Sequence, residues 1–403
     1  MWGHRVSANF MTFPHPDAIT IIAALALCVW VYLTVMHGRF WWFRGYVDED
    51  GSRKTLERWP RVVAIVPARN EAETIGQTID SLTKQNYKGE FSVVVVDDHS
   101  DDGTAKIARN AAQQNGAAER LEIHAAAELP AGWTGKLWAL QEGFSVAEKE
   151  KAEFYWLTDA DVVHAPDTLE RLVGRAEGER LGLTSLMVLL HAETFPERAL
   201  IPPFLYFFLM LYPPRWIADS KARTAGAAGG CVLLRRTALD KIGGIDAIRG
   251  EVIDDCALAR AAERSGGKIW IGLTRESLSL RAYESFGEIR DMIARTAFTQ
   301  LHYSVFFLLG TLAGMTLTYI APVALLFSHE ASVRWMAAAA WLLMSLTFLP
   351  TVRYFRLSAA WAPLLPFSAL FYLYATWLSA VRYWSGRGGQ WKGRAQAARV
   401  SER

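Results

Sequence analysis

Four long uncharged stretches constrain this chain more than any other feature. The first covers residues 18–36, and three more lie near the other end, at residues 303–327, 335–352 and 357–381. A helix of about 20 apolar residues crosses the hydrocarbon core of a bilayer. Hydrophobic residues make up 51% of the chain, yet the net charge is only +2. The surplus of apolar residues is therefore expected in lipid, which predicts a multi-pass membrane protein.

Basic residues indicate the orientation of the first stretch. It is followed by Arg39, Arg44, Arg53 and Lys54 and by Trp41 and Trp42, as in a retained anchor. The positive-inside rule then places the large polar region in the cytoplasm. Three further crossings would put the basic tail outside, which the same rule disfavours, so one assignment must be wrong. Pro363 and Pro366 make residues 357–381 a candidate for a re-entrant or surface-lying hairpin.

Two further segments favour the membrane surface. Residues 199–216 are apolar but short and rich in proline, which indicates an interfacial segment, although a hydrophobic core segment remains an alternative. Residues 289–302 have the pattern of an amphipathic helix. The expected parts of the chain are an anchor at 1–45, a cytoplasmic catalytic domain at 46–288, the interfacial helix at 289–302, a transmembrane region at 303–381 and a basic tail at 382–403.

Charge and cysteine content argue against nucleic-acid binding and against a cysteine-based zinc or dithiol redox site. With 43 basic and 41 acidic residues, the chain lacks the excess of positive charge that nucleic-acid binding requires. The three cysteines are Cys28, Cys231 and Cys256. They lack the C-x-x-C spacing of such sites and fit a reducing compartment.

Between the membrane segments, apolar runs alternate with helical patterns. The runs cover residues 62–66, 91–96, 121–123, 154–157 and 183–190. This alternation predicts an α/β fold with a mostly parallel sheet flanked by helices. A dinucleotide-binding fold is the rival, but its glycine-rich phosphate loop is missing after the first run.

Polar residues follow three of these runs. Ligands of open sheets bind outside the carboxyl ends of the strands, so these residues are site candidates: Pro67, Arg69 and Glu71, then Asp97 and Asp98, then Asp159 and Asp161.

The Asp159-x-Asp161 pair predicts a metal site. Its carboxylates suit Mg²⁺ or Mn²⁺, which would bridge the phosphates of a nucleotide donor. On spacing alone a solvated loop is the commoner explanation, and the position after a buried strand reverses that preference. Lys136 adds a positive charge for the phosphates.

A transfer to a hydroxyl also needs a general base. Asp254 and Asp255 begin a helical pattern, and Asp255 is the preferred base, with Asp254 in support. The alternative is that either residue caps the helix.

Taken together, residues 63–71, 95–104 and 158–161 and the Asp254-Asp255-x-x-Leu258 pattern resemble family 2 glycosyltransferases. The resemblance covers residues 60–300. It implies a GT-A (Rossmann-like) fold with transmembrane helices at both ends, and an inverting, metal-dependent transfer from a nucleotide sugar, expected to be a UDP-sugar.

The resemblance also implies residue roles. The residues expected to bind the donor are Pro67, Arg69, Glu71, Asp97, Asp98, Lys136 and Asp159, and Asp98 is preferred over Asp97. Asp161 and Asp159 are expected to bind the metal, and Asp255 is expected to be the base. Gly229, Gly230, Cys231 and Gln300 are expected on the acceptor side. The place of a Q/R-x-x-R-W motif reads Gln300-Leu301-His302-Tyr303, which argues against processive polymer synthesis.

More narrowly, residues 132–139, 297–301 and 391–394 are similar to bacterial hopene-associated glycosyltransferases. That similarity implies an isoprenoid or hopanoid-type lipid acceptor in the bilayer and a location in a bacterial inner membrane. A polyprenyl-phosphate sugar synthase stays open, since Arg235 and Arg236 would suit a phosphorylated acceptor. A non-catalytic membrane component that binds a nucleotide sugar or lipid is the third hypothesis.

Overall fold

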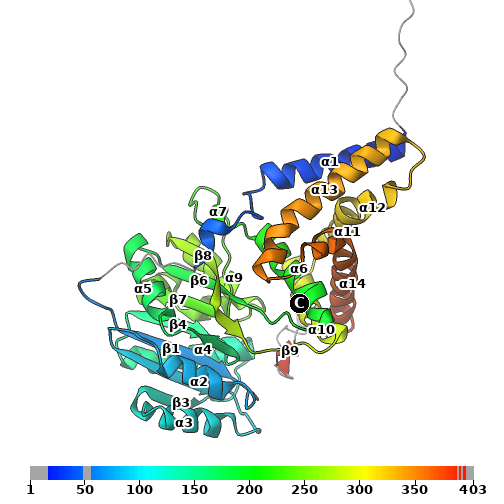
Figure 1. Ribbon diagram of the computed structural model, residues 1–403. Helices are drawn as coiled ribbons and strands as arrows, with labels where there is room; N and C mark the ends of the chain where they lie inside the picture. Colours follow the sequence, from blue (N-terminus) through cyan, green and yellow to red (C-terminus); the bar gives the residue numbers. More distant parts are fainter. Residues whose placement is uncertain (1–16, 49–55, 388–389, 392–393, 396–403) are drawn as a thin grey trace, which may run out of the picture.

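A computed structural model describes residues 17–48, 56–387, 390–391 and 394–395. The α/β part and a group of long helices lie side by side (Figure 1). Arg53 and Lys54, used above for orientation, and Lys392 and Gly393 of the terminal motif lie outside the described residues.

An eight-stranded sheet forms the centre of the α/β part. Its order is β3-β2-β1-β4-β7-β6-β8-β5. The pairs β3–β2, β2–β1, β1–β4 and β6–β8 are parallel, and β4–β7, β7–β6 and β8–β5 are antiparallel. The strands are β1 (Val62–Ala68), β2 (Phe91–Asp97), β3 (Leu121–Ala125), β4 (Phe154–Thr158), β5 (Val162–His164), β6 (Leu183–Leu189), β7 (Cys231–Arg235) and β8 (Ile269–Ser279).

The predicted α/β fold is confirmed. The five predicted apolar runs form β1, β2, β3, β4 and β6. The other three strands complete the sheet, and β7 and β5 introduce the antiparallel pairs. The small strands β9 (Gln390–Trp391) and β10 (Arg394–Ala395) pair with each other.

Alternating side chains of the buried strands face two cores. On β1, Val63 and Ile65 belong to one core, and Val62, Ala64 and Val66 belong to the other. Close packing requires a glycine in helix α4, since a Cβ at Gly143 would lie 2.4 Å from Ile65 Cγ2. The first core continues beyond the α/β part, because it includes Trp30 and Tyr319 of the long helices. One apolar interior therefore joins the two parts of the molecule.

Helices cover both faces of the sheet. They are α2 (Ile75–Thr83), α3 (Thr104–Gln114), α4 (Gly135–Lys149), α5 (Thr168–Glu179), α7 (Pro214–Ile217), α8 (Arg236–Ile242) and α9 (Asp254–Arg264). The remaining helices are α1 (Ala18–Val35), α6 (Phe195–Leu211), α10 (Phe286–Gln300), α11 (Val305–Met315), α12 (Ala321–Leu325), α13 (Ala331–Tyr354) and α14 (Leu365–Trp384).

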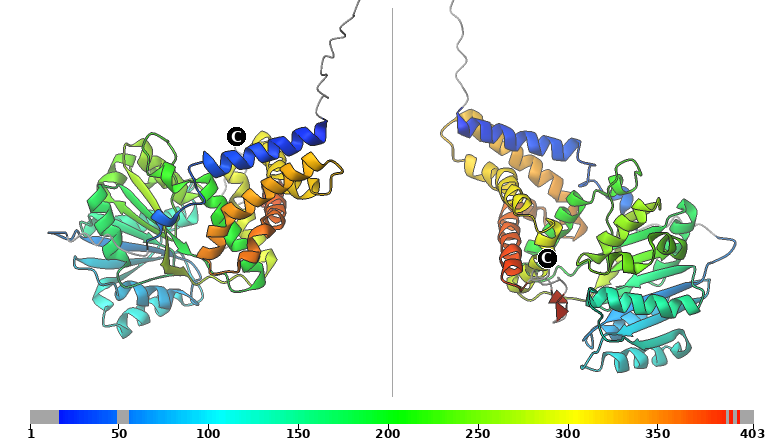
Figure 2. Two further views of the ribbon diagram at one scale, coloured as in Figure 1. Left: turned by 45° about the horizontal axis from the view of Figure 1, so that its top comes forward. Right: turned by 180° about the vertical axis from the view of Figure 1, so that it is seen from behind.

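Four helical segments of the described chain are long and apolar enough to span a membrane. They are Ala18–Val35, Val305–Leu325, Ala331–Tyr354 and Ala359–Trp384. The three C-terminal segments match the predicted apolar stretches. Helices α1 and α13 run side by side away from the sheet (Figure 2).

The segment predicted to be interfacial is mostly a packed core helix. Residues 199–216 contribute to α6, whose start is fixed four residues earlier by a capping box of Thr194 and Glu197. Most of its side chains are buried, including Pro202 and Pro203. The packing therefore favours the alternative of a hydrophobic core segment. The predicted amphipathic helix at 289–302 begins three residues early, at Phe286, because Ser285 caps it.

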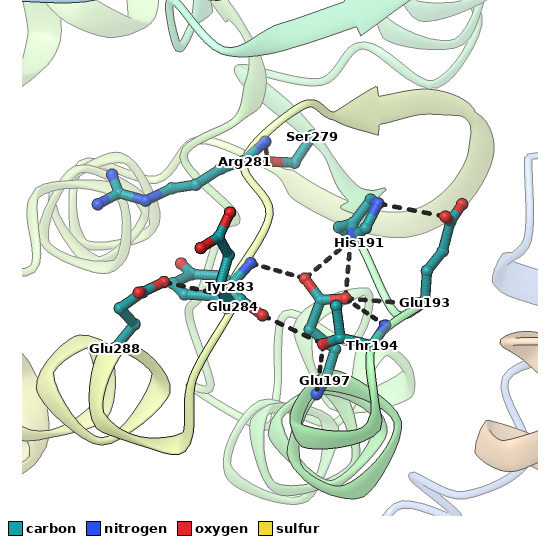
Figure 3. Close-up of polar contacts among 9 residues, drawn as sticks. All are labelled: His191, Glu193, Thr194, Glu197, Ser279, Arg281, Tyr283, Glu284 and Glu288. Atoms are coloured by element: carbon teal, nitrogen blue, oxygen red, sulfur yellow. Dashed lines mark hydrogen bonds and ion pairs between the residues drawn. The ribbon is translucent and has the colours of Figure 1, made fainter.

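A buried carboxylate ties the sheet to these helices (Figure 3). Glu197 has a fully buried side chain and accepts hydrogen bonds from the backbone N–H groups of Glu193, Thr194 and Tyr283 at 2.7–2.9 Å. His191 Nδ1 lies 2.7 Å from the same carboxylate. Burial alone would raise the pKa of Glu197, but these hydrogen bonds lower it to about 2.

Replacement of Glu197 by Gln tests this contact. An amide accepts through one oxygen and turns an N–H₂ group toward backbone donors, so we expect a loss of about 2–3 kcal/mol of stability at neutral pH. The lowered pKa means that the stabilisation is present above about pH 4.5 and is lost as the pH falls toward about 2. Thermal unfolding in detergent measures the difference. Glu193→Gln, at a side chain 81% exposed, is the matched control. Equal melting temperatures for both variants at pH 7 would contradict the role of Glu197.

Candidate active site

The predicted polar residues gather at one edge of the sheet. Strands β2, β1 and β4 are adjacent and parallel, so the residues after Asp97, Ala68 and Thr158 meet at the same edge. Strand β7 runs antiparallel to β4, with Cys231 opposite Thr158, so its first residues reach that edge as well. The order of the strands, rather than the order of the sequence, therefore brings these segments together.

A hollow that is partly open to solvent lies at this edge. It is lined by Pro67, Lys136, Leu137, Leu140, Leu157, Thr158, Asp159, Gly229, Val232, Ile245, Ile248, Asp254, Asp255 and Leu258. Charged groups thus share the hollow with an apolar wall, the common composition of a small-molecule site.

Asp255 is held at the first turn of α9. Its Oδ2 accepts from the backbone N–H of Gly229 at 2.8 Å, and its Oδ1 accepts from the N–H of Cys256 at 2.7 Å. Burial and the neighbouring Asp254 raise the pKa of Asp255 to about 6, against the opposing effect of Lys136. A carboxylate with a raised pKa that is still ionised at neutral pH has the properties of a general base.

Lys136 sits between carboxylates from two elements. Its Nζ lies 2.9 Å from Asp159 Oδ1 and 3.3 Å from Asp254 Oδ2. Burial alone would lower the pKa of Lys136, but Asp159, Asp254 and Asp255 raise it well above its usual value. This single ammonium therefore balances the carboxylates of the hollow.

Asp161 lies beyond Asp159 at the end of β4. Its backbone oxygen accepts from Leu280 N–H at 2.7 Å, which joins it to the segment that follows β8. Burial, Asp159 and Glu71 raise the pKa of Asp161 to about 6, and Arg281 opposes them. The carboxylates of Asp159, Asp161 and Glu71 thus repel one another, and a bound cation would reduce that repulsion.

The donor atoms suit a divalent metal only in part. Among the described residues, no three His, Cys, Asp or Glu side chains are close enough to hold a metal by themselves. Mg²⁺ and related ions are often bound by one or two carboxylates together with substrate phosphates. Asp159 and Asp161 fit that arrangement.

The loops after β1 and β2 are bound to each other. Asn70 N–H donates to Ser100 Oγ at 3.0 Å, and Glu71 N–H donates to Thr104 Oγ1 at 2.9 Å. Asp98 has only 1% of its side chain exposed and lies 3.7 Å from Arg69 Nη1 and 3.2 Å from His99 Nδ1. Asp97 is more accessible and accepts from Ser100 N–H. The preferred donor contact, Asp98, is therefore buried against Arg69 and His99. Asp97 is the more solvent-accessible carboxylate of the pair.

Of the residues expected on the acceptor side, Cys231 points away from the hollow. Gly229 lines the hollow, and Gly230 joins it to β7. Cys231 is fully buried, and its Sγ accepts from Trp156 Nε1 at 3.4 Å in the other core. Side chains alternate along a strand, so Val232 rather than Cys231 faces the hollow. The assignment of Cys231 to the acceptor side is corrected accordingly.

Gln300 lies next to a residue that the sequence did not single out. Its Nε2 is 2.8 Å from the hydroxyl of Tyr212, at the end of α6. Burial raises the pKa of Tyr212, and Cys256, the neighbour of Asp255, raises it further. Tyr212 therefore connects Gln300 with the start of α9. Only the apolar pattern of residues 199–216 marked this tyrosine, so its polar role was not predictable.

The Arg235-Arg236 pair lies far from the hollow. Arg235 stands opposite Phe154, at the other end of the β4–β7 pair from Thr158 and Cys231. Its Nη1 donates to Glu177 at 2.8 Å, and its guanidinium stacks over the Phe154 ring. This pair therefore gives no support to a phosphorylated acceptor.

Comparison with known proteins assigns the region that contains most of these residues. Residues 63–243 match the model of the family described as Glycosyl transferase family 2. The match covers slightly less than half of the chain and includes the ends of β1, β2 and β4 and the loop before β7.

Two curated relatives are similar over part of their length. An N-acetylglucosaminyltransferase of Mesorhizobium japonicum is 26% identical over 201 residues, which cover 47% of this chain and 43% of the relative. An undecaprenyl-phosphate 4-deoxy-4-formamido-L-arabinose transferase of Proteus mirabilis is 28% identical over 125 residues, 30% of this chain and 36% of the relative. The chain thus spans less than half the length of either protein.

One solved structure resembles nearly the whole chain. It is the mannosyltransferase PcManGT from Pyrobaculum calidifontis, in complex with GDP-Man and Mn²⁺. The TM-score is 0.58 at 17% sequence identity, with 90% of this chain and 99% of that chain covered. The similarity shows that the two chains share a GT-A-type fold.

Replacement of Lys136 by Met tests the charge balance of the hollow. Without the ammonium, Asp159, Asp254 and Asp255 repel one another, so we expect lower thermal stability at pH 8. Because Lys136 lowers the pKa of Asp255, the loss should shrink as the pH falls through about 6 and Asp255 takes up a proton. Melting curves at pH 8 and pH 5.5 measure this. Lys84→Met, which breaks an exposed pair with Asp80, is the control and should show little change at either pH. A loss in Lys136→Met that does not depend on pH would contradict the charge balance.

Proposed function

We propose that this protein transfers a sugar from a nucleotide-sugar donor, with a UDP-sugar as the expected donor, to an isoprenoid or hopanoid-type lipid. The match of residues 63–243 to the family described as Glycosyl transferase family 2 supports a sugar transfer. The observation that carries the proposal is the geometry of Asp255, a buried carboxylate that two backbone N–H groups aim into a hollow beside Lys136 and Asp159.

The proposed reaction is a single displacement. Asp255 accepts the proton of the acceptor hydroxyl while the hydroxyl oxygen bonds to the anomeric carbon of the sugar. The bond from that carbon to the diphosphate breaks, the nucleoside diphosphate leaves, and attack from the opposite face inverts the anomeric centre. Lys136 stabilises the negative charge that builds on the departing diphosphate.

In this proposal Asp159 and Asp161 hold Mg²⁺ or Mn²⁺, with Asp161 as the direct ligand. When bound, the ion would supply positive charge for the donor diphosphate. The accumulated carboxylate charge around Asp161 supports this role. Pro67, Arg69, Glu71, Asp97 and Asp98 are proposed to bind the nucleoside, since they lie in the neighbouring loops of the same sheet edge.

Contacts near the hollow support a lipid acceptor. Tyr212 follows α6 and hydrogen-bonds to Gln300 at the end of α10, and both helices pack against α14. In this proposal the acceptor hydroxyl reaches Asp255 from the side of these helices, beside Gly229.

Replacement of Asp255 by Asn tests the proposed reaction. Purified protein in detergent is given UDP-sugars, Mn²⁺ and either a hopanoid or carotenoid alcohol or a polyprenyl phosphate. We expect transfer by the wild type to the neutral lipid, and a fall of about 10²–10⁴-fold in Asp255→Asn with donor binding retained. The wild-type rate should fall below about pH 6, as Asp255 takes up a proton.

Two results would redirect the assignment. Full activity in Asp255→Asn would exclude it as the base. Transfer to polyprenyl phosphate alone would replace the neutral lipid by a phosphorylated acceptor. Asp161→Ala is the matched metal variant, and it should lose Mn²⁺ binding that Asp255→Asn keeps.

We also propose that only three of the four apolar segments cross the membrane. Segment Ala359–Trp384 has 56% of its apolar window buried in the protein, against 22% for Ala18–Val35 and for Val305–Leu325. More than half of this window therefore packs against protein, whereas most of the first and second windows is exposed. A helix that faces lipid on most sides would resemble the first and second segments.

Both ends of this segment contact residues next to the sheet. Trp361 packs on Phe195 with ring centroids 5.8 Å apart, and Arg382 lies 2.6 Å from Asp291. Phe195 and Asp291 belong to α6 and α10, which follow strands β6 and β8 after short links. The six residues between β8 and α10 span at most about 25 Å when fully extended, less than the roughly 30 Å of a hydrocarbon core. Both ends of the segment thus lie on the side of the catalytic domain.

Three crossings remove the conflict in the charge pattern. With the N-terminus outside, α1, the α11–α12 segment and α13 return the chain to the cytoplasmic side, where the basic tail satisfies the positive-inside rule. Tyr354 at the end of α13 supports this arrangement, because its hydroxyl donates to the backbone of Thr274 on β8.

Labelling of single cysteines in a Cys28→Ala background tests the arrangement. An impermeant maleimide should label Arg387→Cys and Glu119→Cys from the same face of sealed vesicles, and His329→Cys from the other. Labelling of Arg387→Cys together with His329→Cys would establish four crossings instead.

A further inference from the structure

A second hollow, partly open to solvent, lies where α1 joins the α/β part. Its walls come from the segment after α1 and from the short helix α7, which are adjacent in Figure 1. The lining residues are Gly38, Arg39, Phe40, Trp42, Phe43, Gly45, Tyr46, Pro214 and Arg215. It shares no residue with the hollow around Asp255.

Close contact between the two segments builds this hollow. Gly38 has φ +60°, and a Cβ there would lie 2.8 Å from Pro213 and 3.1 Å from the ring of Trp216. His37 reinforces the junction, because its Nε2 lies 2.8 Å from the backbone oxygen of Met210 and its ring packs on Trp216. The segment that carries Arg39 is therefore held against the helix that carries Arg215.

The lining residues include two arginines and no aspartate or glutamate. Burial raises the pKa of Tyr46, and the positive charge of Arg215 opposes the rise. Two arginines and a tyrosine at one hollow, with no acidic residue among its described lining residues, match the oxygens of a phosphate.

The hollow lies at the depth of lipid head groups if α1 crosses the bilayer as proposed. Helix α1 ends at Val35, and Arg39 follows four residues later. Trp42, which also lines the hollow, is 56% exposed, as expected for an aromatic residue at the membrane interface. The cytoplasmic leaflet is rich in anionic lipids that attract basic side chains.

We propose that this hollow binds the phosphate of an anionic phospholipid head group through Arg39 and Arg215, with Tyr46 as a hydrogen-bond donor. The site holds the junction of α1 and α7 at the membrane surface. Gly272 of β8 lies against the backbone of Tyr46, since a Cβ there would be 2.7 Å from the Tyr46 oxygen. A lipid bound in the hollow would thus contact the same segment that supports the edge of the sheet.

The test measures bound lipid, so its outcome is independent of sugar transfer. The full chain is equilibrated with phosphatidylcholine nanodiscs that contain increasing fractions of phosphatidylglycerol, and retained lipid is counted by native mass spectrometry. Loss of one arginine should raise the half-saturating fraction about fivefold, and the Arg39→Gln/Arg215→Gln double variant should raise it about 25-fold. Arg215→Lys should retain most of the binding.

Arg44→Gln is the matched control, because Arg44 is exposed on the same segment but does not line the hollow. An equal loss in Arg44→Gln would show general charge attraction and overturn the site. Equal retention of phosphatidylcholine and phosphatidylglycerol by the wild type would also overturn it. Displacement of the lipid by a few millimolar inorganic phosphate would assign the hollow to free phosphate instead. Unchanged melting temperatures establish that the variants are folded.

Discussion

The carboxylate of Glu197 is the contact on which the relation between the sheet and the helices depends. It accepts hydrogen bonds from three backbone N–H groups on two segments, and one of these segments leads from β8 into α10. The same segment carries Leu280, which binds the backbone of Asp161, and Arg281, which opposes the raised pKa of that residue. One buried charge thus fixes the distance between the acidic edge of the sheet and the helices beside it. Its burial is tolerated because its oxygens are well supplied with donors.

Charge balance is the second constraint. Carboxylates from the end of β4 and the start of α9 face one ammonium, Lys136, in a partly buried hollow. The balance is incomplete, because both Asp161 and Asp255 keep raised pKa values. An added cation would reduce the repulsion between these carboxylates, which is the physical basis of the proposed metal. The raised pKa of Asp255 is the basis of its expected pH dependence. Lys136 therefore stabilises the fold and, in the proposed function, the departing diphosphate.

The proposed membrane arrangement rests on packing rather than on hydropathy. Hydropathy does not distinguish the segment Ala359–Trp384 from the other three, because it measures composition alone. The ion pair of Arg382 with Asp291 and the ring contact of Trp361 with Phe195 join both ends of that segment to α10 and α6. In the proposed arrangement, an odd number of crossings agrees with the charge pattern of the chain.

The sequence by itself determined the α/β fold, five of the eight strands and the apolar segments, because these depend on local periodicity and composition. It also determined which acidic residues follow each strand. Because neighbouring parallel strands have their carboxyl ends at the same edge of the sheet, the sequence placed these residues at one edge. Tertiary structure alone decided which of these groups meet. Because β7 pairs with β4, the Cys231 side chain is buried in a core and Arg235 lies at the opposite edge of the sheet. Tyr212 contacts Gln300 because α6 packs beside α10. Such contacts join residues far apart in the chain, and no local pattern records them.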